Sequence, residues 1–406
     1  MLLAGVGGFA VIRGIDPALG MLGQIVVDAS ANYGMSVLPM FILMGVLIHK
    51  AEISEELYDA ANAWLGHFKG GLAHATVASC ALFSAISGSS IATAATMSKV
   101  AIPPMRRLGY HDSLSAGSVA SAGVLGVLIP PSVPLVIFGL MTETDIRKLF
   151  IAVALPGLIL MLMFIVAVWL TVALKPQLGP PGQTRSMRER VRSLRGVWAV
   201  MLLFALVMGG LYGGVFTATE SAGIGSAGAL LIGMARRRMS ARVLLDSLVE
   251  TGRTTAMIFA IVFGALAFAN FITLSGMTSA LVEWIQSQGF SVVGVLLAMA
   301  AIYLVLGCLM EAMGLMLLTV PVFTAIAVDM GVNPIWFGVF VVVMIEIGML
   351  TPPVGMNVFT VKTVNPDIAL PTIFRGVMPF LAANLLLVLM LIAWPQLALA
   401  PVRWLG

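Results

Sequence analysis

Charged residues are scarce in this 406-residue chain: Asp, Glu, Lys and Arg together make up only 10% of it, while 60% is hydrophobic. A soluble domain carries about 25% charged residues, so this composition excludes one. Apolar runs of about 20 residues, long enough to span a bilayer, recur from end to end. Because helices satisfy their own backbone hydrogen bonds in lipid, the composition predicts an all-α integral membrane protein.

Cysteine and catalytic patterns are scarce as well. The two cysteines, Cys80 and Cys308, lie inside apolar segments, whereas a disulfide framework or a zinc site needs more thiols in polar loops. The four histidines are scattered without a zinc-binding spacing. Motifs of hydrolases, ATPases and glycosidases are missing, so neither an enzyme nor an organic cofactor is expected. The net charge of +4 is interpreted as a topology signal, and no nucleic-acid partner is expected.

Two hydrophobic stretches are interrupted in the same way. GVLIPPSVP begins at Gly126 and GMLTPPVGM begins at Gly348, so that Pro130 and Pro352 lie 222 residues apart. This spacing predicts a duplicated chain. Unwound backbone is tolerated at membrane depth only where it lines a cavity, so paired Gly/Pro breaks indicate the binding site of a transporter.

The basic residues orient the predicted spans. The segment 175–195 is a short Arg-rich linker, and such loops stay in the cytoplasm. Counting spans outward from it places 18 of the 22 Lys and Arg residues on the cytoplasmic side. The first repeat then enters the membrane from outside, at residue 34, and the second from the cytoplasm, at residue 254. The repeats are therefore predicted to be inverted.

Each repeat is expected to hold a scaffold span, an amphipathic surface helix, a re-entrant hairpin, a broken span and a closing span. The surface helices are predicted at 54–67 and 275–287, and each carries a tryptophan at helical spacing. The hairpins are predicted at 72–103 and 292–328, as pairs of half-depth helices with tips at the midplane. The predicted parts are an N-terminal span remnant at 1–33, whose first portion is expected to be missing, repeat 1 at 34–174, a cytoplasmic linker and connecting helical hairpin at 175–253, and repeat 2 at 254–406.

The hairpin tips and the breaks carry the candidate chemistry. The first tip, Ser87 to Ser90, offers hydroxyl and carbonyl oxygens, which hard cations such as sodium prefer. Proline removes a backbone donor and frees the carbonyls of the preceding turn, although a plain kink or close helix packing is the alternative. The rare intramembrane carboxyl groups of Glu311 and Glu346 are candidates for binding an ion or a proton, with helix capping as the alternative.

Several motifs resemble one family. They are FSAISGSSIATA from Phe83, GVLIPPSVP from Gly126, FTATESA from Phe216, GCLMEAMG from Gly307 and EIGMLTPPVGMN from Glu346. Over about residues 38 to 389 the chain resembles the large membrane subunit of tripartite ATP-independent periplasmic (TRAP) transporters. The resemblance implies an elevator-type carrier of the ion-transporter superfamily in the bacterial inner membrane. It also implies a sodium gradient as the driving force, a periplasmic substrate-binding protein, a small four-span membrane subunit and a small organic acid as substrate.

The resemblance, taken with the breaks, implies two sodium sites and a substrate cavity. The first sodium site comprises Ser87, Gly88, Ser89, Ser90, Gly126, Ile129 and Pro130. The second comprises Met310, Glu311, Gly314, Gly348, Leu350, Thr351 and Pro352. The substrate cavity is expected to be lined by Ser90, Thr93, Ser132, Asn357 and Thr360.

The identity of the substrate stays open at the level of sequence. A dicarboxylate, a keto acid or a sugar acid fits, and the cavity elements contain no arginine. An anion would have to be held by helix dipoles, by hydroxyls, or by Lys99 and Lys362 near the edges. The alternative function is a stand-alone sodium- or proton-coupled carboxylate carrier of the same superfamily, without a binding protein. An intramembrane enzyme would need a nucleophile with a base, or a metal set, and neither is found.

Overall fold

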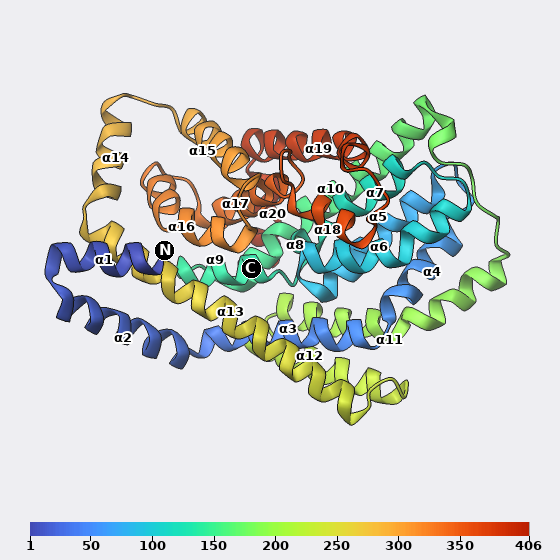
Figure 1. Ribbon diagram of the computed structural model, residues 1–406, viewed down its shortest axis with the longest axis horizontal. Coiled ribbons are helices and arrows are strands. Elements are labelled where there is room, and N and C mark those ends of the chain that lie inside the picture. The colour runs from blue at the N-terminus through green and yellow to red at the C-terminus, as the bar shows by residue number, and fades with distance from the viewer. Residues whose placement is uncertain (406) are drawn as a thin grey trace.

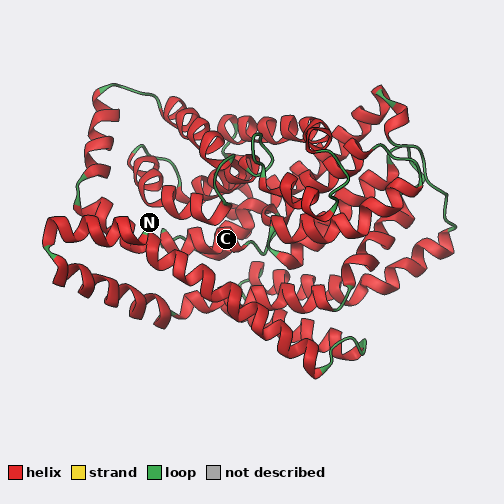
Figure 2. Ribbon diagram, in the orientation of Figure 1, coloured by secondary structure: helices red, strands yellow, loops and turns green. Residues whose placement is uncertain are grey.

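The fold is helical throughout. The computed structural model describes residues 1–405, which contain twenty α-helices, two short 3-10 helices (Tyr33–Ser36 and Pro176–Leu178) and no strand (Figure 2). Seven helical stretches of these residues are long and apolar enough to cross a membrane. The prediction of an all-α membrane protein is therefore confirmed.

The helices form two layers, most easily seen in Figure 1. The lower layer of that view consists of α1 (Leu2–Arg13), α2 (Ile15–Ala31), α3 (Val37–Lys50), α11 (Met187–Tyr212), α12 (Ala218–Ala235) and α13 (Ala241–Leu274). The upper layer begins with α5 (Gly71–Ser87), α6 (Ser90–Arg107), α7 (Asp112–Gly123), α8 (Leu125–Leu128), α9 (Val133–Met141) and α10 (Ile146–Leu174). It is completed by α15 (Val292–Gly307), α16 (Ala312–Asp329), α17 (Pro334–Gly348), α18 (Met356–Val364), α19 (Leu370–Ala393) and α20 (Gln396–Leu405).

Two further helices link the layers, at the positions where surface helices were predicted. Helix α4 (Ile53–Leu65) contacts α11 of the lower layer and α5 of the upper one. Helix α14 (Met277–Ser287) lies crosswise to its neighbours at one end of the molecule, and the 175–186 linker lies at the other end (Figure 1). In α4 the side chain of Leu57 is buried, whereas Trp64 is 38% exposed. Each helix therefore keeps its tryptophan at the protein surface.

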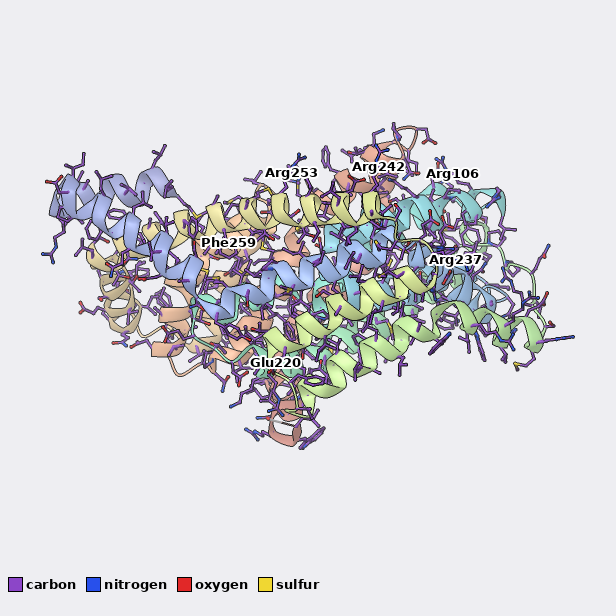
Figure 3. All side chains as sticks on the ribbon, turned by 90° about the horizontal axis from the view of Figure 1, so that it is seen from below. Arg106, Glu220, Arg237, Arg242, Arg253 and Phe259 are labelled. Atoms are coloured by element: carbon purple, nitrogen blue, oxygen red, sulfur yellow. The ribbon has the colours of Figure 1, made fainter. Side chains whose placement is uncertain are left out.

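Several arginines lie far from Glu220. Seen from below, Arg106, Arg237 and Arg242 lie toward one end of the molecule, and Glu220, at the start of α12, lies away from them (Figure 3).

The Arg106 guanidinium lies 2.7 Å from the Asp112 carboxylate and 2.5 Å from the Asp367 carboxylate. This contact lowers the pKa of Asp367, mainly through the hydrogen bond from Arg106. Arg106 therefore ties the base of α6 to the loop that precedes α19.

Both hairpins turn at the predicted positions. Helix α5 ends at Gly88, whose φ of 59° is left-handed, and the Ser89 hydroxyl caps α6 by accepting a hydrogen bond from the Ala92 amide. In the second hairpin, α15 and α16 are joined by 308–311. The arms are longer than the predicted half-depth helices: α5 and α6 have 17 and 18 residues. At 1.5 Å per residue each is about 26 Å long, close to the ~30 Å of a bilayer core.

Both Gly/Pro motifs interrupt helices as predicted. The first interruption, which we call break 1, separates α8 from α9 at 129–132, and its Pro130–Pro131 peptide bond is cis. The second, break 2, separates α17 from α18 at 349–355, and its Pro352–Pro353 bond is also cis. The helices that follow the breaks, α9 and α18, have nine residues each.

Two of the predicted divisions of the chain differ from the helices observed. The boundary at 253/254 lies within the 34-residue helix α13. The N-terminal segment 1–33 holds two helices, which meet at Gly14 with a φ of 95°. The connecting segment therefore continues into the second repeat as one uninterrupted helix.

The closest packing in the upper layer joins its two halves. Helices α7 and α19 cross at Gly117 and Gly376, and a methyl group on Gly376 would lie 1.8 Å from the Ser113 carbonyl oxygen. One on Gly117 would lie 2.4 Å from the Gly376 carbonyl carbon. Glycine is therefore required at both positions, as in close helix crossings in membranes.

Gly376→Ala is expected to lower the thermal unfolding midpoint of the purified protein in detergent, because overpacking a tight contact costs about 1–3 kcal/mol. Gly223→Ala in α12 is the matched control, since its added methyl would meet no atom within 4 Å. Equal midpoints for the two variants would contradict the close crossing of α7 and α19.

Candidate functional site

A cavity of about 370 Å³ lies between the two layers. From the lower layer it is lined by α3 and α13, and from the upper layer by α6, both hairpin tips and the helix ends beside both breaks. Its polar lining residues are His49, Ser87, Ser89, Ser90, Thr96, Lys99, Glu250, Thr254, Glu311 and Glu346. One space therefore collects side chains from segments more than 200 residues apart.

The predicted site residues divide into those that line this cavity and those that do not. Ser87, Gly88, Ser89, Ser90 and Glu311 line it. The others lie outside its lining: Thr93, Gly126, Ile129, Pro130, Ser132, Met310, Gly314, Gly348, Leu350, Thr351, Pro352, Asn357 and Thr360. The tips thus reach the cavity, while the breaks touch it through neighbouring residues such as Val127 and Met349.

The first tip forms a compact group of neutral oxygen atoms. The Ser87 hydroxyl lies 2.8 Å from the Thr93 hydroxyl, and the Thr93 hydroxyl donates to the Ser89 carbonyl at 2.8 Å. Thr93 is fully buried, so it braces the tip from behind rather than facing the cavity. Hydroxyl and carbonyl oxygens suit a hard monovalent cation.

The first tip packs directly on break 1. A methyl group on Gly126 would lie 2.7 Å from the Ser89 carbonyl oxygen, and one on Gly88 would lie 3.1 Å from the Pro131 carbonyl oxygen. Pro130 is buried, and the Ser132 hydroxyl caps α9 by accepting from the Leu135 amide at 3.4 Å. The structure therefore brings the residues of the first predicted sodium site together.

The second tip is organised differently. The Glu311 carboxylate caps α16 and accepts from the amides of Met313 and Gly314 at 3.0 and 3.1 Å. Helix capping was the alternative role predicted for Glu311, and the structure shows it. The same residue also lines the cavity. Glu311 itself is exposed, unlike the buried Ser90 of the first tip.

Break 2 contacts the first arm of its hairpin. A methyl group on Gly348 would lie 2.5 Å from the Gly307 Cα atom, at the end of α15. The Thr351 hydroxyl donates to the Ile347 carbonyl at 2.7 Å, and its amide donates to the Gly348 carbonyl at 3.1 Å. Leu350 is buried and Pro352 is exposed. The second set of predicted residues is therefore less closely gathered than the first.

Glu346 connects the two halves of the chain. Its side chain is 1% exposed, and its Oε1 atom accepts a hydrogen bond from the Ser90 hydroxyl at 3.2 Å. Its Oε2 atom has no partner among residues 1–405. The sequence marks Glu346 as an intramembrane carboxyl group but carries no signal for a partner 256 residues away.

Two residues predicted to line the cavity have other roles. Asn357 is buried and donates from Nδ2 to the Ala120 carbonyl at 3.5 Å, which joins α18 to α7. Thr360 donates to the Met356 carbonyl of its own helix at 2.8 Å. Both side chains are used in packing and local hydrogen bonding.

Sequence reasoning missed the contribution of the lower layer. The His49 ring lies 3.4 Å from the Thr96 hydroxyl, and Glu250 pairs with Lys50 at 3.1 Å. One signal was available in the sequence: Ala92, Thr96 and Lys99 follow one another at helical spacing, which places them on one face of α6, the face that lines the cavity. The approach of α3 and α13 to that face depends on long-range packing.

The comparison with protein families agrees with these motifs. The model described as "Tripartite ATP-independent periplasmic transporter, DctM component" matches residues 1–397. This chain belongs to that family. Its relatives are transport permeases, so this TRAP permease is a membrane transport protein and not an enzyme.

Three curated relatives illustrate the range of the family. The C4-dicarboxylate TRAP transporter large permease DctM of Pseudomonas aeruginosa is 36% identical over 93% of this chain and 88% of its own. The sialic acid TRAP transporter large permease SiaM of Vibrio cholerae is 32% identical over 91% and 86%. The isethionate TRAP transporter permease DctMQ of Oleidesulfovibrio alaskensis is 32% identical over 91% of this chain but only 58% of its own.

A solved structure shares the fold. The YdaH transporter of Alcanivorax borkumensis superposes with a TM-score of 0.61 over 94% of this chain and 89% of its own, at 14% sequence identity. At that identity the likeness concerns the arrangement of helices alone.

The Ser90 to Glu346 hydrogen bond is expected to show in a double-mutant cycle. Ser90→Ala and Glu346→Leu should be coupled by about 0.5–3 kcal/mol in the free energy of unfolding, measured in mixed detergent micelles, because each removes one partner of the hydrogen bond. Ser90→Ala combined with Glu220→Gln should show additive effects, because Glu220 is an exposed residue at the start of α12, outside the cavity lining. A coupling near zero for Ser90 and Glu346 would mean that the two halves do not meet through this bond.

Proposed function

We propose that this chain is the membrane permease subunit of a sodium-gradient-driven, binding-protein-dependent uptake system for small organic acids. The observation that carries the proposal is the single cavity that collects both tips and the flanks of both breaks. The named substrates of the relatives, C4-dicarboxylates, sialic acid and isethionate, are all organic acids. The substrate class is therefore a dicarboxylate, keto acid or sugar acid.

The charge of the cavity supports coupling to a cation. The Glu311 carboxylate lies on its wall and would repel an organic anion bound there. Sodium bound at the first tip, among neutral oxygens, and near Glu311 at the second tip would offset that repulsion. A cation gradient could then drive anion uptake, since each ion stabilises the bound substrate.

The two layers support an elevator motion. The upper layer, with the two hairpins as re-entrant elements of inverted repeats, would move as a transport domain against the lower layer as scaffold. Helix α4 is suited to be a fixed arm, because the Arg236 guanidinium pairs with Glu56 and also donates to the Gly196 carbonyl of α11. Alternating access would open the cavity to one side of the membrane at a time.

The partners and the location follow from the same proposal. We expect a multi-pass protein of the bacterial inner membrane, with a periplasmic substrate-binding protein and a small four-span membrane subunit. The DctMQ relative extends well beyond the region matched by this chain, as a permease with the small subunit fused to it would. The exposed leucines of α11 and its one tryptophan, Trp198, are suited to contact lipid or that subunit.

Ser89→Trp is expected to reduce sodium-driven uptake at least about tenfold, because a bulky side chain would occupy the tip where sodium is proposed to bind. The measurement is uptake into proteoliposomes containing the permease, the small subunit and the cognate binding protein, with and without a sodium gradient. Ser287→Trp on the exposed face of α14 is the control and should transport normally. Wild-type uptake by Ser89→Trp with unchanged sodium dependence would remove the first ion site.

The proposed topology makes a labelling prediction. In a background with Cys80 and Cys308 replaced, Met187→Cys should react with a membrane-impermeant maleimide only from the cytoplasmic side, since Met187 is 63% exposed at the start of α11. Reaction in intact spheroplasts, from the periplasmic side, would overturn the orientation of every span.

A further inference from the structure

Two lysines were candidates for holding an anionic substrate, and the structure separates them. The Lys362 ammonium donates to the Pro366 carbonyl at 2.6 Å and to the Ile368 carbonyl at 2.9 Å, and it lies outside the cavity lining. Lys99 lines the cavity. Within residues 1–405 it has neither an ion-pair partner nor a hydrogen-bond partner. Lys99 is therefore the lysine available to a ligand.

The other charged groups of the cavity wall are already engaged. Glu250 pairs with Lys50 at 3.1 Å, the Glu311 carboxylate caps α16, and one oxygen of Glu346 accepts from Ser90. His49 lies beside the Thr96 hydroxyl. Lys99 is left as the cation on this wall whose charge no carboxylate of the described chain offsets by direct contact.

The position of Lys99 along α6 determines how long a ligand must be to reach both this lysine and the start of the helix. Ala92, in the first turn of α6, and Lys99 line the same cavity and are seven residues apart, or about 10 Å along the helix axis. Helix side chains lean toward the N-terminus, so the lysine stem shortens the distance between its ammonium and the first turn. A ligand that reaches from the first turn of α6 to the ammonium would have the size of a short dicarboxylate. The first turn also carries the positive end of the helix dipole.

We propose that Lys99 binds an acidic group of the substrate and makes the permease prefer dicarboxylic over monocarboxylic acids. One carboxylate lies toward the first tip and the first turn of α6, and the other pairs with the Lys99 ammonium. A lysine on a flexible stem suits a group that must be held and then released. The inference rests on the proposed function, since it names the substrate class of the same cavity.

Ligand-induced thermal stabilisation of the purified full chain tests the proposal. The ligands are a series of dicarboxylates from malonate to adipate, with the monocarboxylates of equal carbon number, at constant ionic strength and saturating sodium. Wild-type protein is expected to bind at least one diacid about tenfold more tightly than its monoacid counterpart. Lys99→Gln should lose that preference, whereas Lys99→Arg, which keeps the charge, should retain most of it.

Lys362→Gln is the matched control, because it removes the same charge outside the cavity and should keep the preference. Equal ligand-free unfolding midpoints for Lys99→Gln and wild type would show that the variant is folded. A diacid preference that survives in Lys99→Gln overturns the inference, and so does wild-type protein that favours no diacid. Uptake assays separate the two proposals: diacid binding without sodium-driven uptake would sink the proposed function and leave the role of Lys99 standing.

Discussion

Backbone amides and carbonyls have no water to bond with inside a bilayer, and this constraint governs where the chain stops being helical. Each interruption in the upper layer is satisfied by nearby groups. The Ser89 and Ser132 hydroxyls and the Glu311 carboxylate cap the helices that restart, and in break 2 the Asn357 amide donates to the Met349 carbonyl. Break 1 is buried from Pro130 to Ser132, whereas Pro352 and Pro353 of break 2 are exposed, so only the first of the two interruptions is enclosed by this chain.

The same constraint explains why the two sets of predicted ion ligands differ. At the first tip the oxygens are hydroxyls and carbonyls, and Gly126 lets break 1 approach them closely. At the second tip a carboxylate caps α16, Thr351 bonds to the last carbonyls of α17, and the Asn357 amide bonds to the Met349 carbonyl of break 2. Similar sequence motifs in the two halves have thus produced one compact oxygen cluster and one more open arrangement.

The sequence was sufficient for features that depend on local backbone chemistry. The turns at the hairpin tips and the interruptions at the breaks follow from Gly, Pro and polar residues within a few positions, and helices begin and end at these places. The half-depth placement of the hairpin arms stays a prediction, because the composition of 72–87 does not say how much of an apolar helix lies in lipid and how much packs on protein. The Ser90 to Glu346 contact and the approach of α3 and α13 to the cavity depend on packing between distant segments. Lys362 and Lys99 differ in their surroundings. The loop after α18 supplies the two carbonyls that accept hydrogen bonds from Lys362.

The crossing of α7 and α19 limits how far the two halves of the upper layer can slide past each other. These helices come from different halves of the chain and meet at Gly117 and Gly376 with no room for a methyl group. Close-packed contacts of this kind resist sliding, because any relative shift brings backbone atoms into overlap. The two halves of the upper layer are therefore held to each other at this crossing. In the proposed transport cycle, a crossing of this kind would keep the first predicted sodium site and the second at a constant spacing whichever way the upper layer moves.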